Sequence, residues 1–431
     1  YEVHAVSINT GGFTELEIKD IESKAYQMGV KTYQNIDAVE SYYQKVVKFL
    51  IFGNVLKNNT YPLSVSAERS IQALEIIKYA KKINADYVAH GSTGAGNDQV
   101  RFDLIFQTLA PEIKIITPIR DQHLSRQEEI QFLIANGIEL TWSKAKYSIN
   151  KGLWGTSIGG QETLTSHLPL PEEAYPSQLQ KKDEQQVQLT FSKGELVAVN
   201  KEQDLPHKCI EKLNKLASKY AIGRDIHVGD TILGIKGRVG FEAAAATITI
   251  KAHHLLEKHI LTKWQLQHKE YLSNWYGTHL HEGLFLDPVM RDLESFLENS
   301  QTQVSGHVYV SLKPYHFTID GIASKNDLSI LTDGISPIDW TTQIIPNEDD
   351  SLSQSDALSD SLDVSETETT NAEAGESIVN MLEVVEQNGL AVSVTSTVKL
   401  PADIPFIVSG LANAVSPLPV ATETPESLKT S

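Results

Sequence analysis

The alternation of short strands with amphipathic helices over the first 120 residues restricts the fold more than any other feature of this sequence. β-Branched runs lie at 3–8, 85–90 and 113–119, and helical periodicity separates them, most clearly over 15–28 and 66–83. Strands that alternate with helices of 10–15 residues form parallel sheets covered by helices on both faces. We therefore expect an open α/β domain in the first third of the chain.

The pattern changes after Trp142. Strand-like segments lie at 187–200 and 307–319, and long helical segments lie at 243–264 and 284–300. A capping box of Ser125 and Glu128 also predicts a helix that ends at Gly137. These signals predict an α/β domain over 1–141, an α+β domain over 142–347 and a tail over 348–431.

The tail carries most of the negative charge. Of the net charge of −18, fifteen acidic and two basic residues fall after Asn347, which leaves −5 for residues 1–347. Residues 348–377 contain no Lys, Arg or aromatic residue, so they cannot bury enough apolar surface to offset the entropy of ordering. We expect a mostly disordered acidic tail and no nucleic-acid partner.

Two further features of the composition limit the class of protein. No apolar run reaches the roughly 18–20 residues that span a bilayer, so we expect no membrane segment. The single cysteine, Cys209, excludes a disulfide framework and a cysteine-built metal site, and it favours a cytoplasmic location.

The stretch "AHGSTGAGNDQVRF" at 89–102 is the strongest candidate for a binding site. It joins a strand to a helix, and ligands of open α/β sheets bind at the carboxyl ends of the strands. Its glycines allow a ligand to approach the backbone, Arg101 suits a carboxylate, and Asp98 suits an ammonium group. The combination indicates a ligand with both charges, such as an amino acid. The alternative is a glycine-rich turn in which Asp98 caps the helix and Arg101 forms a surface ion pair.

Other clusters of polar or aromatic residues have simpler interpretations. We expect His253, His254, Glu257 and His259 to be solvated and not to bind metal, and His279, His281 and Glu282 to lie on a strand or turn. Lys236 and Arg238 suit either phosphate steering or a basic hairpin turn. Packing is the expected role of Trp154, Phe241 and Cys209.

Five motifs together resemble the argininosuccinate synthase family. They are "NTGG" at 9–12, "NNTYPLSVSAER" at 58–69, "HGSTGAGNDQVRFD" at 90–103, "KYSINKGLWGTSIGG" at 146–160 and "GRDIHVGDTILGIKGRVGFEAAA" at 223–245. The resemblance runs in order from Tyr1 to about Ile345. It implies an ATP-pyrophosphatase-type, Rossmann-like nucleotide-binding domain followed by a synthetase and multimerisation domain.

The resemblance also implies a reaction. This family joins L-citrulline to L-aspartate through a citrullyl-adenylate, using ATP with Mg²⁺, and yields argininosuccinate, AMP and diphosphate in arginine biosynthesis. A homotetramer is implied as well. The implied ATP contacts are Ile8 and Gly91, those of aspartate are Thr93, Asn97 and Asp98, and those of citrulline are Tyr61, Ser66, Asn97, Arg101, Ser148 and Ser157. No protein metal ligand is implied.

The sequence departs from the family pattern in three places. Family members open with a strand, a phosphate-binding loop of the "SGGLDTS" kind and a helix, whereas this sequence starts at the next strand. We therefore expect the chain as given to be a poor catalyst. Gly229 and Phe241 stand where the family commonly has a glutamate and a tyrosine that contact citrulline, and Asp230 is a candidate to replace the carboxylate. The acidic tail stands in place of a helical arm.

Two alternatives to an impaired synthase follow from these departures. One is a non-catalytic amino-acid-binding or assembly subunit derived from the family. The other is a different ATP-pyrophosphatase, of the amidotransferase or RNA-thiolating kind, which would need a glutaminase domain or a reactive cysteine. The lone cysteine, in an apolar helical stripe, disfavours the latter.

Overall fold

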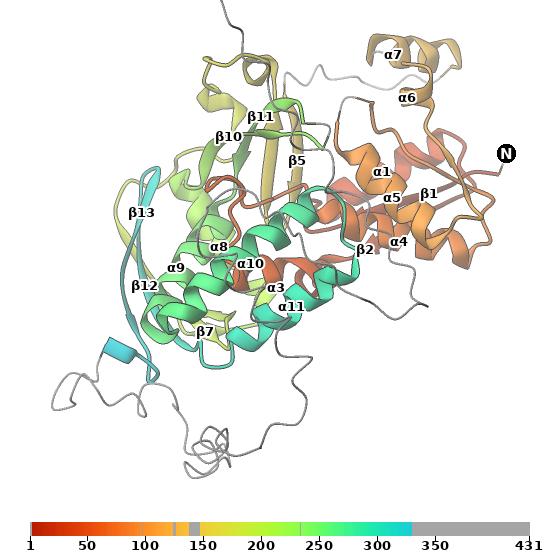
Figure 1. Cartoon of the computed structure of the whole chain (residues 1–431). Coiled ribbons are helices and arrows are strands. Elements are labelled where there is room, and N and C mark those ends of the chain that lie inside the picture. Colours follow the sequence, from red (N-terminus) through yellow and green to blue (C-terminus); the bar gives the residue numbers. More distant parts are fainter. Residues whose placement is uncertain (1, 95, 124–125, 138–146, 233, 330–431) are drawn as a thin grey trace, which may run out of the picture. The chain divides into compact units, whose positions relative to one another are not determined.

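The expected alternation of strands and helices is present, and its strands form two parallel pairs (Figure 1). β1 (His4–Asn9) pairs with β2 (Thr32–Asp37), and β3 (Tyr87–Ala89) pairs with β4 (Lys114–Ile116). The computed structural model describes residues 2–94, 96–123, 126–137, 147–232 and 234–329. Within these ranges, no strand is hydrogen-bonded to both β1 and β3, so the two pairs are separate sheets.

Helices connect and cover these strands. Thr14 and Glu17 form a capping box at the start of α1, and each reciprocal hydrogen bond is present. The helical region that follows Asp37 is one run with a π-helical turn at its centre. The helices of this region are α1 (Glu15–Gln27), α2 (Val39–Tyr42), η1 (Tyr43–Val47), α3 (Lys48–Phe52), α4 (Glu68–Lys82), α5 (Asp98–Leu109), α6 (Pro118–Asp121) and α7 (Arg126–Ala135).

A groove of about 650 Å³ separates the two parallel pairs. Residues of β1, β3 and the C-terminal half of α4 line it, including Val6, Val88 and Ile76. The groove therefore has strand edges for its walls and apolar side chains on its surface.

The second half of the molecule contains two antiparallel sheets, as expected for an α+β region. The four-stranded sheet has the order β10-β11-β6-β5, and the five-stranded sheet has the order β13-β12-β7-β8-β9. Their strands are β5 (Ser148–Gly152), β6 (Gly155–Gly159), β7 (Gln185–Ser192), β8 (Glu195–Val199), β9 (Glu202–Gln203), β10 (Arg224–Asp230), β11 (Lys236–Glu242), β12 (Gly306–Lys313) and β13 (His316–Ala323).

The helices of this half pack on the larger sheet and on one another. α8 contacts β8, α9 contacts β12 and β13, and α10 contacts α11. The helices are α8 (Pro206–Ala217), α9 (Ala244–Ile260), α10 (Lys263–His281) and α11 (Pro288–Ser300), with short 3₁₀ turns η2 (Gln161–Leu164), η3 (Glu172–Ala174) and η4 (Ser218–Tyr220). Trp154, Cys209 and Phe241 are buried, which confirms their expected packing roles.

The expectation that His253 and Glu257 are solvated is wrong, because both are fully buried. α9 is enclosed by α3, α8 and the larger sheet, so the face that carries these residues lies in the core. The Nδ1 and Nε2 atoms of His253 contact the side-chain amide oxygens of Asn54 and Gln301 at 2.7 and 2.8 Å, and Lys269 forms an ion pair with Glu257 at 2.9 Å. Within the described ranges, no group of His, Cys, Asp and Glu side chains could hold a metal ion.

The assignment of His279 and His281 to a strand or turn is also wrong. Both lie in the last turn of α10, and Glu282 is its C-cap. Thr262 and Gln265 form a capping box at the start of this helix. That capping signal was visible in the sequence and would have predicted the helix.

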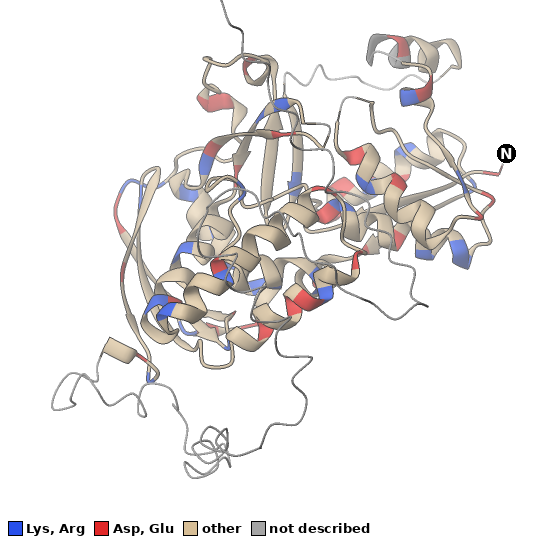
Figure 2. Ribbon diagram, viewed as in Figure 1, with Lys and Arg blue, Asp and Glu red and all other residues tan. Residues whose placement is uncertain are grey.

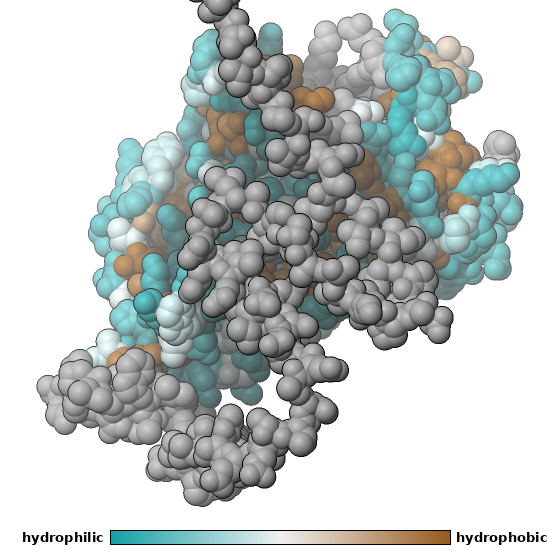
Figure 3. All heavy atoms as spheres, in the orientation of Figure 1, coloured by the Kyte–Doolittle hydropathy of each residue, from teal (hydrophilic) through white to brown (hydrophobic). Residues whose placement is uncertain are grey.

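Charged residues of both signs are interspersed over the described helices and strands (Figure 2). The same view in space-filling form shows mainly hydrophilic residues with smaller hydrophobic areas between them (Figure 3). None of the helices in the described ranges has the length and apolarity to cross a membrane. The Ser125 cap and the tail over 348–431 lie outside the described residues.

Candidate active site

A cavity of about 420 Å³ lies where the N-terminal ends of α4 and α5 meet the β10–β11 hairpin and the β5–β6 hairpin. Most of the residues that line it carry polar side chains, which suits a charged small molecule better than an apolar one. The side chains that line it include Tyr61, Ser66, Arg69, Thr93, Asn97, Asp98, Arg101, Asn150, Ser157, His227, Asp230 and His281.

Seven of the residues implied by the family resemblance lie on this wall. They are Tyr61, Ser66, Thr93, Asn97, Asp98, Arg101 and Ser157. Three others do not line the cavity. Ile8 is buried near the end of β1, Gly91 follows β3, and Ser148 is an exposed residue at the start of β5.

The glycine-rich loop borders open space. A Cβ atom at Gly96 would meet no protein atom within 4 Å, and one at Gly91 would meet only Ile119 at 3.9 Å. An alanine at either position would therefore not collide with the rest of the protein. Their value lies in leaving the backbone accessible to a ligand.

Asn97 is the N-cap of α5, but its side chain does not cap the helix. Its Oδ1 accepts a hydrogen bond from the Ile232 N–H at 2.9 Å. The glycine-rich loop is thus tied to the turn between β10 and β11.

Arg101 is buried, with 4% of its surface exposed, so the alternative of a surface ion pair does not hold. Its Nε and Nη2 donate to the His281 carbonyl at 3.0 and 2.7 Å, and its Nη1 donates to Asp98 Oδ1 at 2.9 Å. Most of the donors of this guanidinium are therefore occupied by the protein. Arg101 fixes Asp98 against the end of α10.

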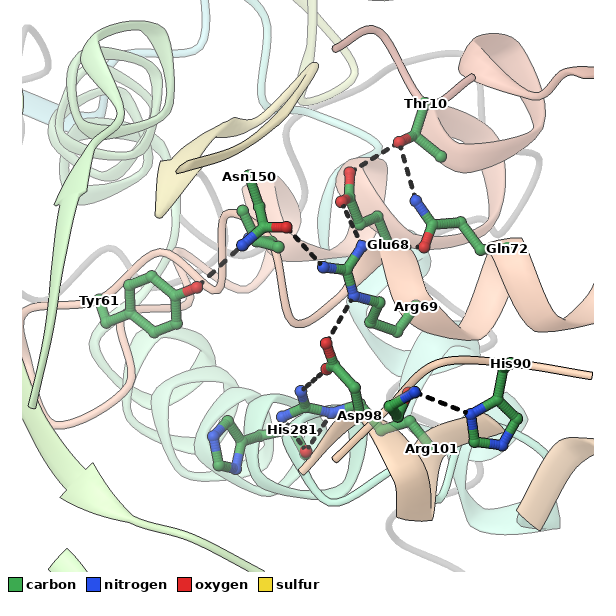
Figure 4. A network of polar contacts seen from close by, with 12 residues as sticks. Thr10, Tyr61, Glu68, Arg69, Gln72, His90, Asp98, Arg101, Asn150 and His281 are labelled. Carbon is green, nitrogen blue, oxygen red and sulfur yellow. Dashed lines mark hydrogen bonds and ion pairs between the residues drawn. The ribbon is translucent and has the colours of Figure 1, made fainter. Parts of the chain in front are cut away.

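A chain of polar contacts continues from Asp98 toward β1 (Figure 4). Asp98 Oδ2 accepts from Arg69 Nε at 3.0 Å, and Arg69 Nη1 donates to Glu68 Oε1 at 3.0 Å. Glu68 Oε2 accepts from the Thr10 hydroxyl at 2.7 Å. Acidic and basic groups therefore alternate from Thr10 to the wall of the cavity.

The two carboxyl groups of this chain differ in their electrostatics. Burial raises the pKa of Glu68 to about 7, although Arg69 and Thr10 oppose the shift. Burial would also raise the pKa of Asp98, but Arg69 and Arg101 outweigh it and hold that pKa below its usual value. Asp98 therefore presents a stable negative charge to the cavity, as a site for an ammonium group requires.

Tyr61 stands between two aromatic rings. Its ring lies 5.1 Å from the His227 ring and 5.3 Å from the Phe241 ring. Phe241 is 1% exposed and does not line the cavity, so it supports Tyr61 from behind. Edge and face packing of this kind holds an aromatic wall in place.

The imidazole ring of His227 fills the space beside Gly229. A Cβ atom at Gly229 would lie 2.3 Å from His227 Nε2, so no side chain fits there unless the imidazole moves. Asp230 also lines the cavity, where it pairs with Lys236 at 2.6 Å. Lys236 and Arg238 lie on the β10–β11 hairpin, which is the position that the interpretation as a basic hairpin predicted.

Two buried polar atoms on the wall lack partners. Among the described residues, neither Ser66 Oγ nor His227 Nδ1 has a hydrogen-bond partner. Burial lowers the pKa of His227, and burial with nearby Arg101, Lys57 and His227 lowers the pKa of His281 to about 3. Both imidazoles are therefore neutral near pH 7, and polar groups of a ligand would satisfy the unpaired atoms.

Several residues of this wall were not predicted from the sequence. Arg69 lies within the quoted motif at 58–69, and Asn150 lies within the motif at 146–160, so proximity to the motifs could have suggested both. His227 lies within the motif at 223–245 and could have been suggested in the same way, whereas His281 lies outside the five motifs. His281 reaches the site because α10 ends there, 180 residues after Arg101 in the chain.

Comparison with known proteins agrees with this architecture. Residues 1–139 match the argininosuccinate synthase N-terminal HUP domain, and residues 147–361 match the argininosuccinate synthase C-terminal domain. An argininosuccinate synthase of Methanocaldococcus jannaschii is 38% identical over 72% of this chain and 79% of its own length.

Other argininosuccinate synthases show similar agreement. The protein of Dictyoglomus turgidum is 36% identical over 76% of this chain and 83% of its own length. That of Pyrococcus furiosus is 35% identical over 76% of this chain and 80% of its own length. Two domain matches in sequence order, together with these identities, show that the chain belongs to the argininosuccinate synthase family.

Proposed function

We propose that this chain binds L-citrulline and L-aspartate side by side and serves their ATP-dependent ligation to argininosuccinate. The observation that carries the proposal is the cavity, which gathers seven of the residues expected to contact the two amino acids. Asp98 would receive the ammonium group of aspartate with Thr93 and Asn97 nearby, and Tyr61, Ser66 and Ser157 would contact citrulline.

The residues of the cavity would act by position and charge. The ureido oxygen of citrulline attacks the α-phosphorus of ATP with release of diphosphate, and the amino group of aspartate then displaces AMP. Neither step needs a protein nucleophile, so holding the reactants in line is the main contribution of the chain. The fixed carboxylate of Asp98 and the unpaired hydroxyl of Ser66 suit that task.

ATP would lie at the carboxyl ends of β1 and β3, near Ile8 and Gly91. The open space beside Gly91 fits a nucleotide, and open α/β sheets bind ligands at this edge. Mg²⁺, when bound, would neutralise the phosphates of ATP. The homotetramer and the cytoplasmic location implied by the family are part of the same proposal.

The groove between β1 and β3 bears on how active the chain is. In the 3-2-1-4-5 order of doubly wound sheets, the first strand lies between the second and the fourth, and its following loop binds phosphate. β1 and β3 flank a groove of about 650 Å³ in that position. We propose that a strand and phosphate-binding loop placed there would be needed for full turnover, and that the chain as given is impaired.

Diphosphate release with ATP, Mg²⁺, citrulline and aspartate tests this function. We would compare the chain as given with a version preceded by a strand, a phosphate-binding loop and a helix. Turnover by the extended version alone would support an impaired synthase with a sound amino-acid site. Binding of either amino acid without turnover in both versions would favour a non-catalytic binding subunit.

A further inference from the structure

Glu68 is a buried carboxyl group one step behind the wall of the cavity. It is the first residue of α4, is 1% exposed and does not line the cavity itself. Each of its oxygens has a donor, since Oε2 accepts from Thr10 and Oε1 accepts from Arg69. Burying a carboxylate without hydrogen-bond partners would cost folding free energy, so the role of Glu68 is best understood from the groups that it contacts.

The protein encloses this carboxyl group from three segments. Thr10 follows β1, Arg69 belongs to α4, and Gly152 ends β5. A Cβ atom at Gly152 would lie 2.2 Å from Glu68 Oε2, so the backbone of β5 closes directly on the carboxylate. The enclosure keeps water away and strengthens each electrostatic contact that Glu68 makes.

Arg69 connects this enclosed group to the cavity. Its guanidinium donates to Glu68, to Asp98 and, at 3.4 Å, to Asn150 (Figure 4). Asp98 lies between the guanidinium groups of Arg69 and Arg101. Glu68 and Asp98 both interact with the guanidinium group of Arg69. The charge of Glu68 therefore determines how strongly Arg69 attracts the carboxylate of Asp98.

We propose that Glu68 is a positioning residue for the amino group of L-aspartate, acting through Arg69 on Asp98. This inference rests on the proposed function. When Glu68 is ionised, Arg69 is shared between two carboxylates, and Asp98 retains acceptor strength for the ammonium group of the substrate. When Glu68 is neutral, Asp98 alone balances two guanidinium groups, and its attraction for the substrate ammonium is weaker.

The neighbouring charges give this arrangement a pH dependence. The groups that face Glu68 are Arg69 from α4, Asp98 from α5 and Tyr42 from α2, with the neutral Thr10 and Gln72 beside them. Burial raises the pKa of Glu68 to about 7, so its charge changes within the physiological range. Because the ionised form favours the ammonium group, affinity for aspartate should increase as pH rises from 6 to 8.

Calorimetric titration of the full chain with L-aspartate at pH 6, 7 and 8 tests this inference. For the unaltered chain we expect Kd to fall about 3- to 10-fold over this range, as one group with a pKa near 7 gives. Glu68→Gln should bind weakly at all three values, with little change. The matched control is Glu294→Gln, which removes another buried carboxyl group with a pKa of about 7, paired with Arg291 outside the cavity. This control should follow the unaltered chain.

A second variant changes the same group without removing it. Thr10→Val deletes a hydrogen bond that lowers the pKa of Glu68, so the midpoint of the pH profile should move upward. A Glu68→Gln profile as steep as that of the unaltered chain, or an unmoved midpoint in Thr10→Val, would overturn the inference. Citrulline affinity should stay constant throughout. If the unaltered chain binds neither amino acid, the proposed function itself fails, and the positioning role of Glu68 fails with it.

Discussion

Two buried ionic clusters in this molecule differ in whether one of their charged groups faces a cavity. In the core cluster, Lys269 donates to Glu257 at 2.9 Å and to the Phe52 carbonyl at 2.8 Å. Gln301 joins Glu257 to His253. Burial opposes ionisation of Glu257, but His253 and Lys269 outweigh it and hold its pKa below the usual value. The core cluster is closed, and its members satisfy one another.

The cluster at the cavity, formed by Glu68, Arg69, Asp98 and Arg101, has a different balance. It contains one carboxyl group whose pKa is held low and another whose pKa is raised to about 7. The group with the low pKa faces the cavity. Burial alone therefore does not separate a structural ion cluster from one at a candidate binding site; the difference is a carboxylate that faces a cavity.

The core cluster should show its effect in stability. Lys269→Met keeps the length of the side chain but leaves Glu257 as an unpaired buried charge. We expect the free energy of unfolding to fall by about 3–5 kcal/mol, as when one partner of a buried pair is removed. Urea unfolding followed by circular dichroism measures this. Lys258→Met, on an exposed face of α9, is the matched control and should change little. Equal stability of the two variants would refute a structural role for the core cluster.

The cavity cluster should show its effect in binding. Asp98→Asn removes the charge that would hold the ammonium group, and we expect affinity for L-aspartate to fall about 10- to 100-fold, as loss of a charge-assisted hydrogen bond gives. Calorimetry or a thermal-shift titration measures it. Asp103→Asn is the control on the same helix, since Asp103 pairs with His90 and Arg120 outside the cavity. Equal weakening by both variants would show that helix integrity, and not the open acceptor, controls binding.

Gly229 tests whether the wall of the cavity is as tightly packed as the core. Gly229→Ala places a methyl group against the His227 ring, and we expect a loss of about 1–3 kcal/mol in stability from overpacking. Chemical unfolding of this variant, of His227→Ala and of the double variant gives the coupling. The loss should largely disappear when the imidazole is absent. Additive effects would mean that the loss does not arise from contact with the imidazole.

The smallest effect expected is a pH dependence of stability in the core cluster. Burial lowers the pKa of His253 to about 4, from 6.5 when unperturbed. The unfolded chain therefore binds a proton before the folded chain does, and stability should decline as pH falls from about 6.5 toward 4. Urea unfolding at pH 7, 6 and 5 measures the slope, which His253→Asn should reduce. An unchanged slope would assign the acid sensitivity to other groups.

Local patterns predicted the secondary structure better than they predicted burial. The periodicity of 15–28 and 66–83 gave α1 and α4, because amphipathic stripes and caps are encoded in neighbouring residues. His253 and Glu257 seemed solvated because helical spacing shows which residues share a face and not what covers that face. α10 was missed despite its capping box, and with it the role of His281.

Residues of the site that lie in one short motif were predicted from the sequence, and those that depend on distant segments were not. Thr93, Asn97, Asp98 and Arg101 were found because one short motif contains them. Glu68 drew no attention, since its position behind Arg69 depends on β1, α4 and β5 meeting at one point. Gly229 was noted as a departure from the family pattern, and the structure shows that the neighbouring His227 occupies the space beside it.

The contact between Arg101 and the His281 carbonyl has a consequence for biosynthesis. Arg101 leaves the ribosome 180 residues before the carbonyl that receives its two hydrogen bonds. Chains emerge and fold from the N terminus, so Arg101 lacks its final acceptor until α10 is complete. The proposed site therefore matures late in translation, because a nascent chain that ends before residue 281 has no acceptor for two of the hydrogen bonds of Arg101.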